Sequence, residues 1–159
     1  MDRDGAGVLW GRVGNSPRVG EPLFGEMHSG RQYECMYALK CQVCGGAASK
    51  NEDGYLFIIF PEPADPSSWP ERALTTQPPL CLEHAQLSMR RCPHRGEFLV
   101  VRAKVPKLWG VQSVLYRYTG DDWEFETEVP PLKYGDVRLN AALASHLIRE
   151  LRNVKEVEL

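Results

Sequence analysis

Two short segments, Cys41-Gln-Val-Cys44-Gly45-Gly46 and Cys81-Leu-Glu-His84, decide how this chain is organised. Each carries two side chains that can bind a metal, and the 36 residues between Cys44 and Cys81 are enough to bring the pairs together. Three thiols and one imidazole, arranged as two local chelates, suit a tetrahedral zinc ion. The sequence therefore predicts a structural Zn²⁺ site formed by Cys41, Cys44, Cys81 and His84.

The two pairs are expected on different kinds of backbone. Cys-x-x-Cys-Gly-Gly favours a tight turn in which a glycine takes a positive φ and amides point at the first sulfur. The second pair begins a helical pattern over 81–91, where positions i and i+3 share one face near the positive end of the helix dipole. Between them, Asp53-Gly54 before Tyr-Leu-Phe-Ile-Ile-Phe60 predicts a β-hairpin.

A knuckle, a hairpin and a helix that carries the second ligand pair resemble the treble-clef zinc finger. The resemblance covers residues 41 to about 91, roughly a third of the chain, and implies a bound zinc ion without implying an activity. The Cys-Gln-Val-Cys-Gly-Gly opening also resembles that of a family of small bacterial proteins, again without implying an activity.

Cys92-Pro-His94 lies outside this pattern. On an unbroken helix Cys92 would sit about 16 Å beyond Cys81, at ~1.5 Å per residue, which is too far to share a metal. We expect Cys92 to be a packed thiol under a helix that Pro93 ends, and Cys35 to pack in the preceding helix. Two alternatives stay open: a second site with His94 and Cys35 or His28, or Cys92 in place of His84.

Composition is that of a globular protein. The 159 residues are 43% hydrophobic and 25% charged, with a net charge of −2. The first residues contain no apolar signal-peptide core, and the longest apolar run, 55–60, is far shorter than a membrane span. Five cysteines in metal-like spacing favour reduced thiols, so we expect a cytoplasmic protein that does not enter the membrane.

The expected fold class is α+β. We expect residues 1–26 to be a loose arm, or a strand packed only at Trp10, followed by one zinc-containing domain over 27–159. Its zinc half, 27–95, begins with a helix over 28–40 and contains a proline-rich loop over 61–79, in which Trp69 anchors the loop. Its second half, 96–159, is expected to be a small, mostly antiparallel sheet covered by a C-terminal helix.

That sheet-and-helix half is predicted from periodicity. Strands are expected at 98–105 and 111–118 around a turn at 106–110, and a half-buried strand with one acidic face at 123–129. Asp136 is expected to cap a helix whose apolar stripe reaches Leu151, and 153–159 to add a final strand. Trp109, Tyr116 and Tyr118 are expected to fill the core, with stacking surfaces for a nucleic acid as the alternative.

The enzyme classes associated with such sites are disfavoured. A nuclease of the HNH type needs a general-base His in the hairpin, and the strand at 54–60 has none. No His-x-Glu precedes a Pro-Cys-x-x-Cys, as a deaminase requires, and four protein ligands leave no open position for a catalytic water. No phosphate-binding loop, serine elbow or HExxH motif is present.

Charge is unevenly distributed. Residues 84–118 hold seven Lys or Arg and one acid, whereas 119–129 hold five acids and no base. One interpretation is a basic surface at Arg90, Arg91 and Arg95 that contacts nucleic acid or another partner. The other is that basic and acidic strands pair with each other, which we favour for Arg102 and Lys104.

Two functional hypotheses follow. The first is a zinc-stabilised binding module, regulatory or adaptor-like, that contacts protein or nucleic acid. The second is an accessory enzyme of a small-molecule biosynthetic pathway, with a pocket between the zinc half and the sheet. A cleft lined by Cys92, His94 and the long loop would favour the second.

Overall fold

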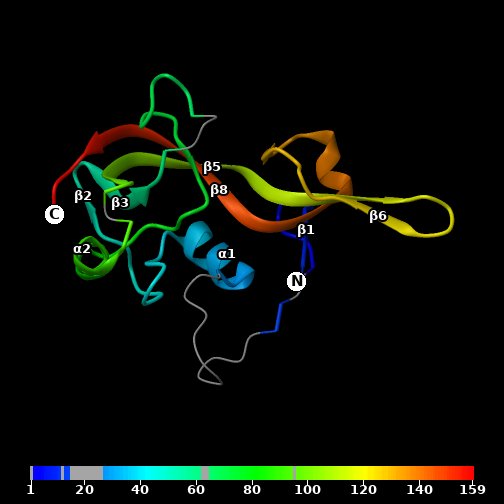
Figure 1. Cartoon of the computed structure of the whole chain (residues 1–159), viewed down its shortest axis with the longest axis horizontal. Helices are drawn as coiled ribbons and strands as arrows, with labels where there is room; N and C mark the ends of the chain where they lie inside the picture. The colour runs from blue at the N-terminus through cyan, green and yellow to red at the C-terminus, as the bar shows by residue number, and fades with distance from the viewer. Residues whose placement is uncertain (1, 12, 15–26, 62–64, 95) are drawn as a thin grey trace.

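One strongly curled, half-barrel sheet dominates the computed structural model, which describes residues 2–11, 13–14, 27–61, 65–94 and 96–159 (Figure 1). Its strand order is β1-β8-β5-β3-β2, with β4 added to β8 and β6 and β7 added to β5. The strands are β1 (Leu9–Trp10), β2 (Lys50–Asn51), β3 (Gly54–Ile59), β4 (Leu74–Thr75), β5 (Leu99–Tyr118), β6 (Trp123–Glu126), β7 (Leu132–Lys133) and β8 (Ala142–Glu156). The helices are α1 (Ser29–Ala38), α2 (Leu82–Arg91) and the short 3₁₀ helix η1 (Val137–Ala141).

The centre of the sheet is an antiparallel ladder between β5 and β8, which runs along the long axis of the molecule (Figure 1). The predicted turn at 106–110 is wrong, because β5 continues through Pro106 and Gly110 as one strand of 20 residues. Proline gives no ladder N–H, and the register shifts between Leu108 and Gly110. The proline and the register shift therefore bend β5 without turning the chain back on itself.

The predicted C-terminal helix is also wrong. Asp136 does cap a helix, since its carboxylate accepts the Arg138 N–H at 2.9 Å, but that helix ends at Ala141. The apolar stripe that follows belongs to β8. Ala and Leu favour helix in isolation, yet pairing with β5 over 13 residue pairs overrides that preference. The final strand expected at 153–159 is present only as the continuation of β8 to Glu156.

The α+β division into a zinc half and a separate sheet is corrected as well. The β2–β3 hairpin forms as predicted, with Asn51 opposite Gly54, but β3 pairs along its length with β5. Five of the six β3 residues are buried, so this strand needs neighbours on both faces. At Gly54 a Cβ would lie 2.1 Å from the Ala103 carbonyl oxygen, which shows how closely the two strands approach.

Helix α1 confirms the prediction of a helix near 28–40 and packs on β8. Its buried Gln32 behaves like a piece of backbone: the amide group donates to the Leu147 carbonyl at 2.8 Å and accepts the Leu147 N–H at 2.9 Å. From β8, buried Arg149 donates to the carbonyls of Met36 and Tyr37, in the last turn of α1, and to that of Pro106. Two polar side chains thus fix the helix on the sheet.

At the N-terminus, β1 pairs in parallel with β8, and Val8 before it is fully buried. Residues 15–26 lie outside the described residues, so the proposed arm at 1–26 and the division at 27 stay predictions. Trp69 packs against the cluster around Phe57 and Leu151, as its predicted anchoring role requires. Within the described ranges, no helix is long and apolar enough to cross a bilayer.

The acidic strand β6 forms but is not half-buried: all four of its residues are exposed. Together with the end of β5 it makes a two-stranded ribbon that extends beyond the rest of the molecule (Figure 1). Tyr118 is 56% exposed, so the expectation that it fills the core is wrong.

Candidate metal centre and adjacent cleft

The four residues predicted to bind zinc come together. The donor atoms of Cys41, Cys44, Cys81 and His84 all lie within 4.8 Å of one another. In a tetrahedral site with bonds of about 2.3 Å, ligand atoms are ~3.8 Å apart, so this set needs little adjustment to hold an ion. No other group of three or more metal-binding side chains occurs among the described residues.

The first pair sits in a tight turn after α1. The Cys41 N–H donates to the Gly46 carbonyl at 2.7 Å, the Gly45 N–H donates back to the Cys41 carbonyl at 2.8 Å, and Gly45 has φ +73°. Arg31 of α1 clamps the turn by donating to the Gln42 and Val43 carbonyls at 3.0 and 2.5 Å. The glycines therefore do what the sequence predicted, while the arginine clamp was not foreseen.

The second pair begins α2. Cys81 is its N-cap residue, and the Cys81 Sγ lies 3.0 Å from His84 Nδ1, one turn along. The preceding Leu80 exchanges backbone hydrogen bonds with Leu56 and Ser49, which fixes the helix start against the β2–β3 hairpin. Fully buried Ala85 packs the helix on the cluster that contains Cys41. The β2–β3 hairpin thus packs against both segments that carry the candidate ligands.

The pKa values of the Cys41 and Cys81 thiols are shifted in opposite directions. Burial opposes ionisation of Cys41, but N–H groups of Cys44, Cys81 and Val43 outweigh it and hold the pKa of this thiol below its ordinary value. The pKa of Cys81 is raised, first by burial and then by the neighbouring Cys41 and Cys44. The cluster therefore favours a first thiolate at Cys41, and a cation would be needed to stabilise further ones.

The other candidate ligands lie apart from this cluster. Cys92 packs against the hydrophobic cluster that contains Leu56 and Ala85, as expected, and Cys35 is 2% exposed with its thiol directed at the Cys41 carbonyl. His94 is exposed and contacts Glu97 at 3.0 Å. His28 caps α1 by accepting the N–H groups of Gly30 and Arg31. The described residues therefore form no second site, and His84 keeps its place in the first.

The predicted basic surface is present only in part. Arg90 and Arg91 are exposed in the last turn of α2 and form no ion pair with any described residue, whereas Arg95 lies outside the described residues. Arg102 does not pair with the acidic strand. Its guanidinium is buried and donates to the Gly54 carbonyl and the Ser49 hydroxyl at 2.9 and 3.0 Å. On the acidic strand, it is Arg117 that pairs with Glu124.

A cleft of about 870 Å³ lies where the proline-rich loop crosses the ladder. One face of β8 lines it with His146, Ile148 and Glu150, and β5 adds Trp109 and Gln112. Further walls come from Phe60, directly after β3, and from loop residues between Asp65 and Gln77. The long loop lines the cleft, but Cys92 and His94 are not among the lining residues, so the cleft lacks two of the three features predicted for an enzyme pocket.

Hydrogen bonds at the cleft fix the form of His146. Ser145 donates its hydroxyl proton to the Gln112 carbonyl at 3.3 Å, so its oxygen accepts from His146 Nδ1 at 3.0 Å. Burial lowers the pKa of His146. The neutral imidazole therefore keeps its proton on Nδ1 and leaves the Nε2 lone pair available as an acceptor.

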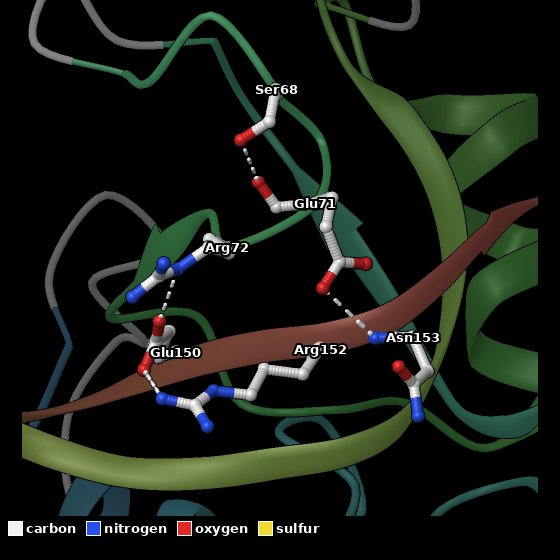
Figure 2. Close-up of polar contacts among 6 residues, drawn as sticks. All are labelled: Ser68, Glu71, Arg72, Glu150, Arg152 and Asn153. Atoms are coloured by element: carbon white, nitrogen blue, oxygen red, sulfur yellow. Dashed lines mark hydrogen bonds and ion pairs between the residues drawn. The ribbon is translucent and has the colours of Figure 1, made fainter.

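The loop wall of the cleft is fastened to β8 (Figure 2). Glu150 is buried, and its two carboxylate oxygens accept from Arg72 at 2.9 Å and Arg152 at 2.7 Å. The Glu71 carboxylate accepts the N–H groups of Asn153 and Val154 at 3.1 and 2.9 Å. Sequence analysis missed this network, because its loop members Glu71 and Arg72 are 78 or more residues from their partners on β8 and show no local pattern.

Comparisons with protein-family models, with curated proteins and with solved structures found no match to this chain. The assignment of the centre therefore rests on its own geometry: four predicted ligand residues that the fold brings to one point and that could hold a metal ion.

Proposed function

We propose that the chain is a zinc-stabilised binding module in which Cys41, Cys44, Cys81 and His84 hold Zn²⁺ as a closed, structural site. The observation that carries this proposal is the convergence of three sulfurs and one imidazole nitrogen within 4.8 Å. Soft thiolates select zinc over magnesium or calcium, and four protein ligands leave no position for a reacting water.

The order of elements around the cluster supports a treble-clef-like arrangement. A knuckle carries the first pair, the β2–β3 hairpin follows, and the start of α2 carries the second pair. In such a module the ion replaces apolar core: α2 has one fully buried residue, Ala85, and is held largely through its first turn. Zinc binding would therefore supply folding free energy.

Metal analysis of protein purified without added metal tests the site, with one zinc per chain expected. Cys44→Ser should release the ion and lower the melting temperature, because it removes a ligand. Cys92→Ser is the matched control, because Cys92 is not one of the four candidate metal ligands. This variant should keep the zinc, at a packing cost of about 1–2 kcal/mol. A Cys44→Ser protein that retains full zinc would refute the assignment.

The cleft supports a second candidate function, the binding of a small organic molecule. Its volume of about 870 Å³ falls within the range of ligand sites, and its lining combines apolar side chains with His146. An enzymatic role for this cleft would require a bound substrate near the His146 imidazole.

A fluorescent anionic dye, 8-anilinonaphthalene-1-sulfonate, can probe the cleft. We expect saturable binding that Gln112→Glu weakens, because the change adds a negative charge to the cleft wall with little change in size. Gln86→Glu, on α2 and outside the cleft, should leave binding unchanged. Equal binding by both variants would remove the cleft as the binding site.

A further inference from the structure

The ribbon formed by the end of β5 and by β6, here the β5–β6 hairpin (residues 115–126), carries all its aromatic side chains on one face. Tyr116 lies opposite Phe125, and Tyr118 lies opposite Trp123. Directly opposed residues of an antiparallel pair share a face, and residues two apart on a strand share it too. The other face carries the pairs Leu115–Glu126 and Arg117–Glu124.

Among the described residues, the rings of this aromatic face stack only on one another, and the Tyr118 hydroxyl donates to the Gly120 carbonyl in the adjoining turn. The Trp123 ring lies 5.6 Å from that of Tyr116 and 5.2 Å from that of Tyr118, measured between centroids. Trp123 is 53% exposed and Phe125 60% exposed, and none of the four belongs to a core cluster. A two-stranded ribbon gains little stability alone, so an exposed aromatic face on it indicates a surface for binding.

The carboxylates around the aromatic face limit the class of partner that can bind there. Five carboxylates and no basic side chain lie between Thr119 and Val129, and Arg117 is already paired with Glu124. The carboxylates occupy the turn, the opposite face and the following residues, so they surround the aromatic face without interrupting it. Phosphate backbones would be repelled there, whereas Lys and Arg side chains would be attracted to the acids and to the faces of the rings.

A second copy of the chain fits this surface less well. An aromatic residue buries at most ~150–250 Å², and Tyr118, Trp123 and Phe125 are only 56%, 53% and 60% exposed, so the aromatic face alone falls short of the roughly 800 Å² per partner of a stable interface. A copy docked face to face would also bring its own set of carboxylates to the same place.

We propose that the β5–β6 hairpin docks a basic polypeptide segment, with Lys or Arg side chains placed over Tyr116, Tyr118, Trp123 and Phe125. This inference rests on the proposed role as a binding module and names its partner class. It does not depend on the metal, because the hairpin lies at the opposite end of the ladder from α2 (Figure 1).

The test uses a fluorescein-labelled peptide of alternating Arg and Gly, and a second peptide in which citrulline replaces each Arg. Anisotropy titration of the zinc-loaded full chain should show binding of the Arg peptide that weakens with salt, and no binding of the citrulline peptide. The double change Trp123→Ser, Phe125→Ser should weaken binding by at least about tenfold, or ~1.4 kcal/mol. Val137→Ser, an 81% exposed apolar residue elsewhere, should not weaken it.

A second variant, Glu126→Gln with Glu128→Gln, removes charge and keeps the aromatic face. It should weaken the interaction and reduce its salt dependence. Zinc content and the melting transition, measured in parallel, should stay unchanged in every variant, so loss of peptide binding is distinguishable from loss of the metal site. Equal binding of the two peptides, binding unaffected by the aromatic changes, tighter binding of duplex DNA, or a dimer abolished by Trp123→Ser would each overturn the proposal.

Discussion

At the scale of single residues, the buried polar side chains determine how the elements join. Arg149 is 6% exposed and is satisfied by three backbone carbonyls, and burial lowers its pKa to about 10. Gln32 pairs with the backbone of Leu147 as a neighbouring strand would. Neither is visible in the sequence, where a lone Arg or Gln inside an apolar pattern has no recognisable partner. The grouping of Cys41, Cys44, Cys81 and His84 was predictable because each pair has the spacing of a local chelate.

Glu150 provides a test at this scale. Its carboxyl has a pKa below the ordinary 4.5, chiefly because of the hydrogen bond from Arg152, although burial opposes the shift and Arg72 also contributes. A lowered folded-state pKa means that the stabilisation is present above 4.5 and is lost as pH falls through the lowered value. We expect Glu150→Gln to cost about 1–3 kcal/mol near neutral pH and less in acid.

Urea unfolding at several pH values would measure this effect. Glu34→Gln is the control, because its pair with Lys40 is exposed on the surface and should contribute little at any pH. A cost for Glu150→Gln that does not change between neutral and acid pH would show that the charge is not what stabilises the loop.

At the scale of elements, the local signals of the hairpin and of the helix starts were interpreted correctly, whereas the turn expected at 106–110 and the helix expected after Asp136 were not. The Asp53-Gly54 turn and the helix after Cys81 formed where predicted, since each depends on neighbouring residues. The stripe from Val137 to Leu151 has the composition of a helix. Most of it nevertheless lies in β8, which pairs with β5, β1 and β4. Pairing between residues far apart in the chain decided the outcome, and periodicity does not report it.

The pairing of β7 with the long strand β5 depends on a single residue, Gly110. A Cβ there would lie 2.0 Å from the carbonyl oxygen of Leu132, which belongs to β7, the strand that pairs with β5 at this point. We therefore expect Gly110→Ala to separate β7 from β5 and to destabilise the protein by about 2–4 kcal/mol. In Gly96→Ala, where a Cβ would meet nothing within 4 Å, stability should change little. Thermal unfolding of the two variants measures the difference, and similar melting temperatures would contradict the close packing at Gly110.

At the scale of the whole molecule, the β5–β8 ladder connects two hydrophobic clusters. The cluster around α2 includes the candidate metal ligand Cys41, whereas the cluster around Val8, Met36 and Leu147 contains none of the four candidate ligands. The fold class could be predicted only as far as a mixture of helices and antiparallel strands, because the curled sheet arises from pairings that span the chain.

Removing the metal should separate these two parts. With a chelator present, we expect amide hydrogens of α2 and of the β2–β3 hairpin to exchange much faster, while those of β8 between Leu143 and Ile148 remain protected, because their cluster contains no ligand. Hydrogen exchange read by mass spectrometry, with Cys44→Ser as a second way of removing zinc, would test this. Uniform loss of protection along the chain would mean that the metal supports the entire fold.

The parallel pairing of β1 with β8 has a consequence for synthesis on the ribosome. Leu9 meets Leu143, so β1 is made long before the strand with which it pairs. All four candidate metal ligands are translated by His84, and the knuckle, hairpin and second pair could assemble before β8 is made. Val8, β4 and the carbonyls at the end of α1 must stay unpaired until β8 emerges. During that interval the nascent chain exposes strand edges that a chaperone, or another nascent chain, can bind.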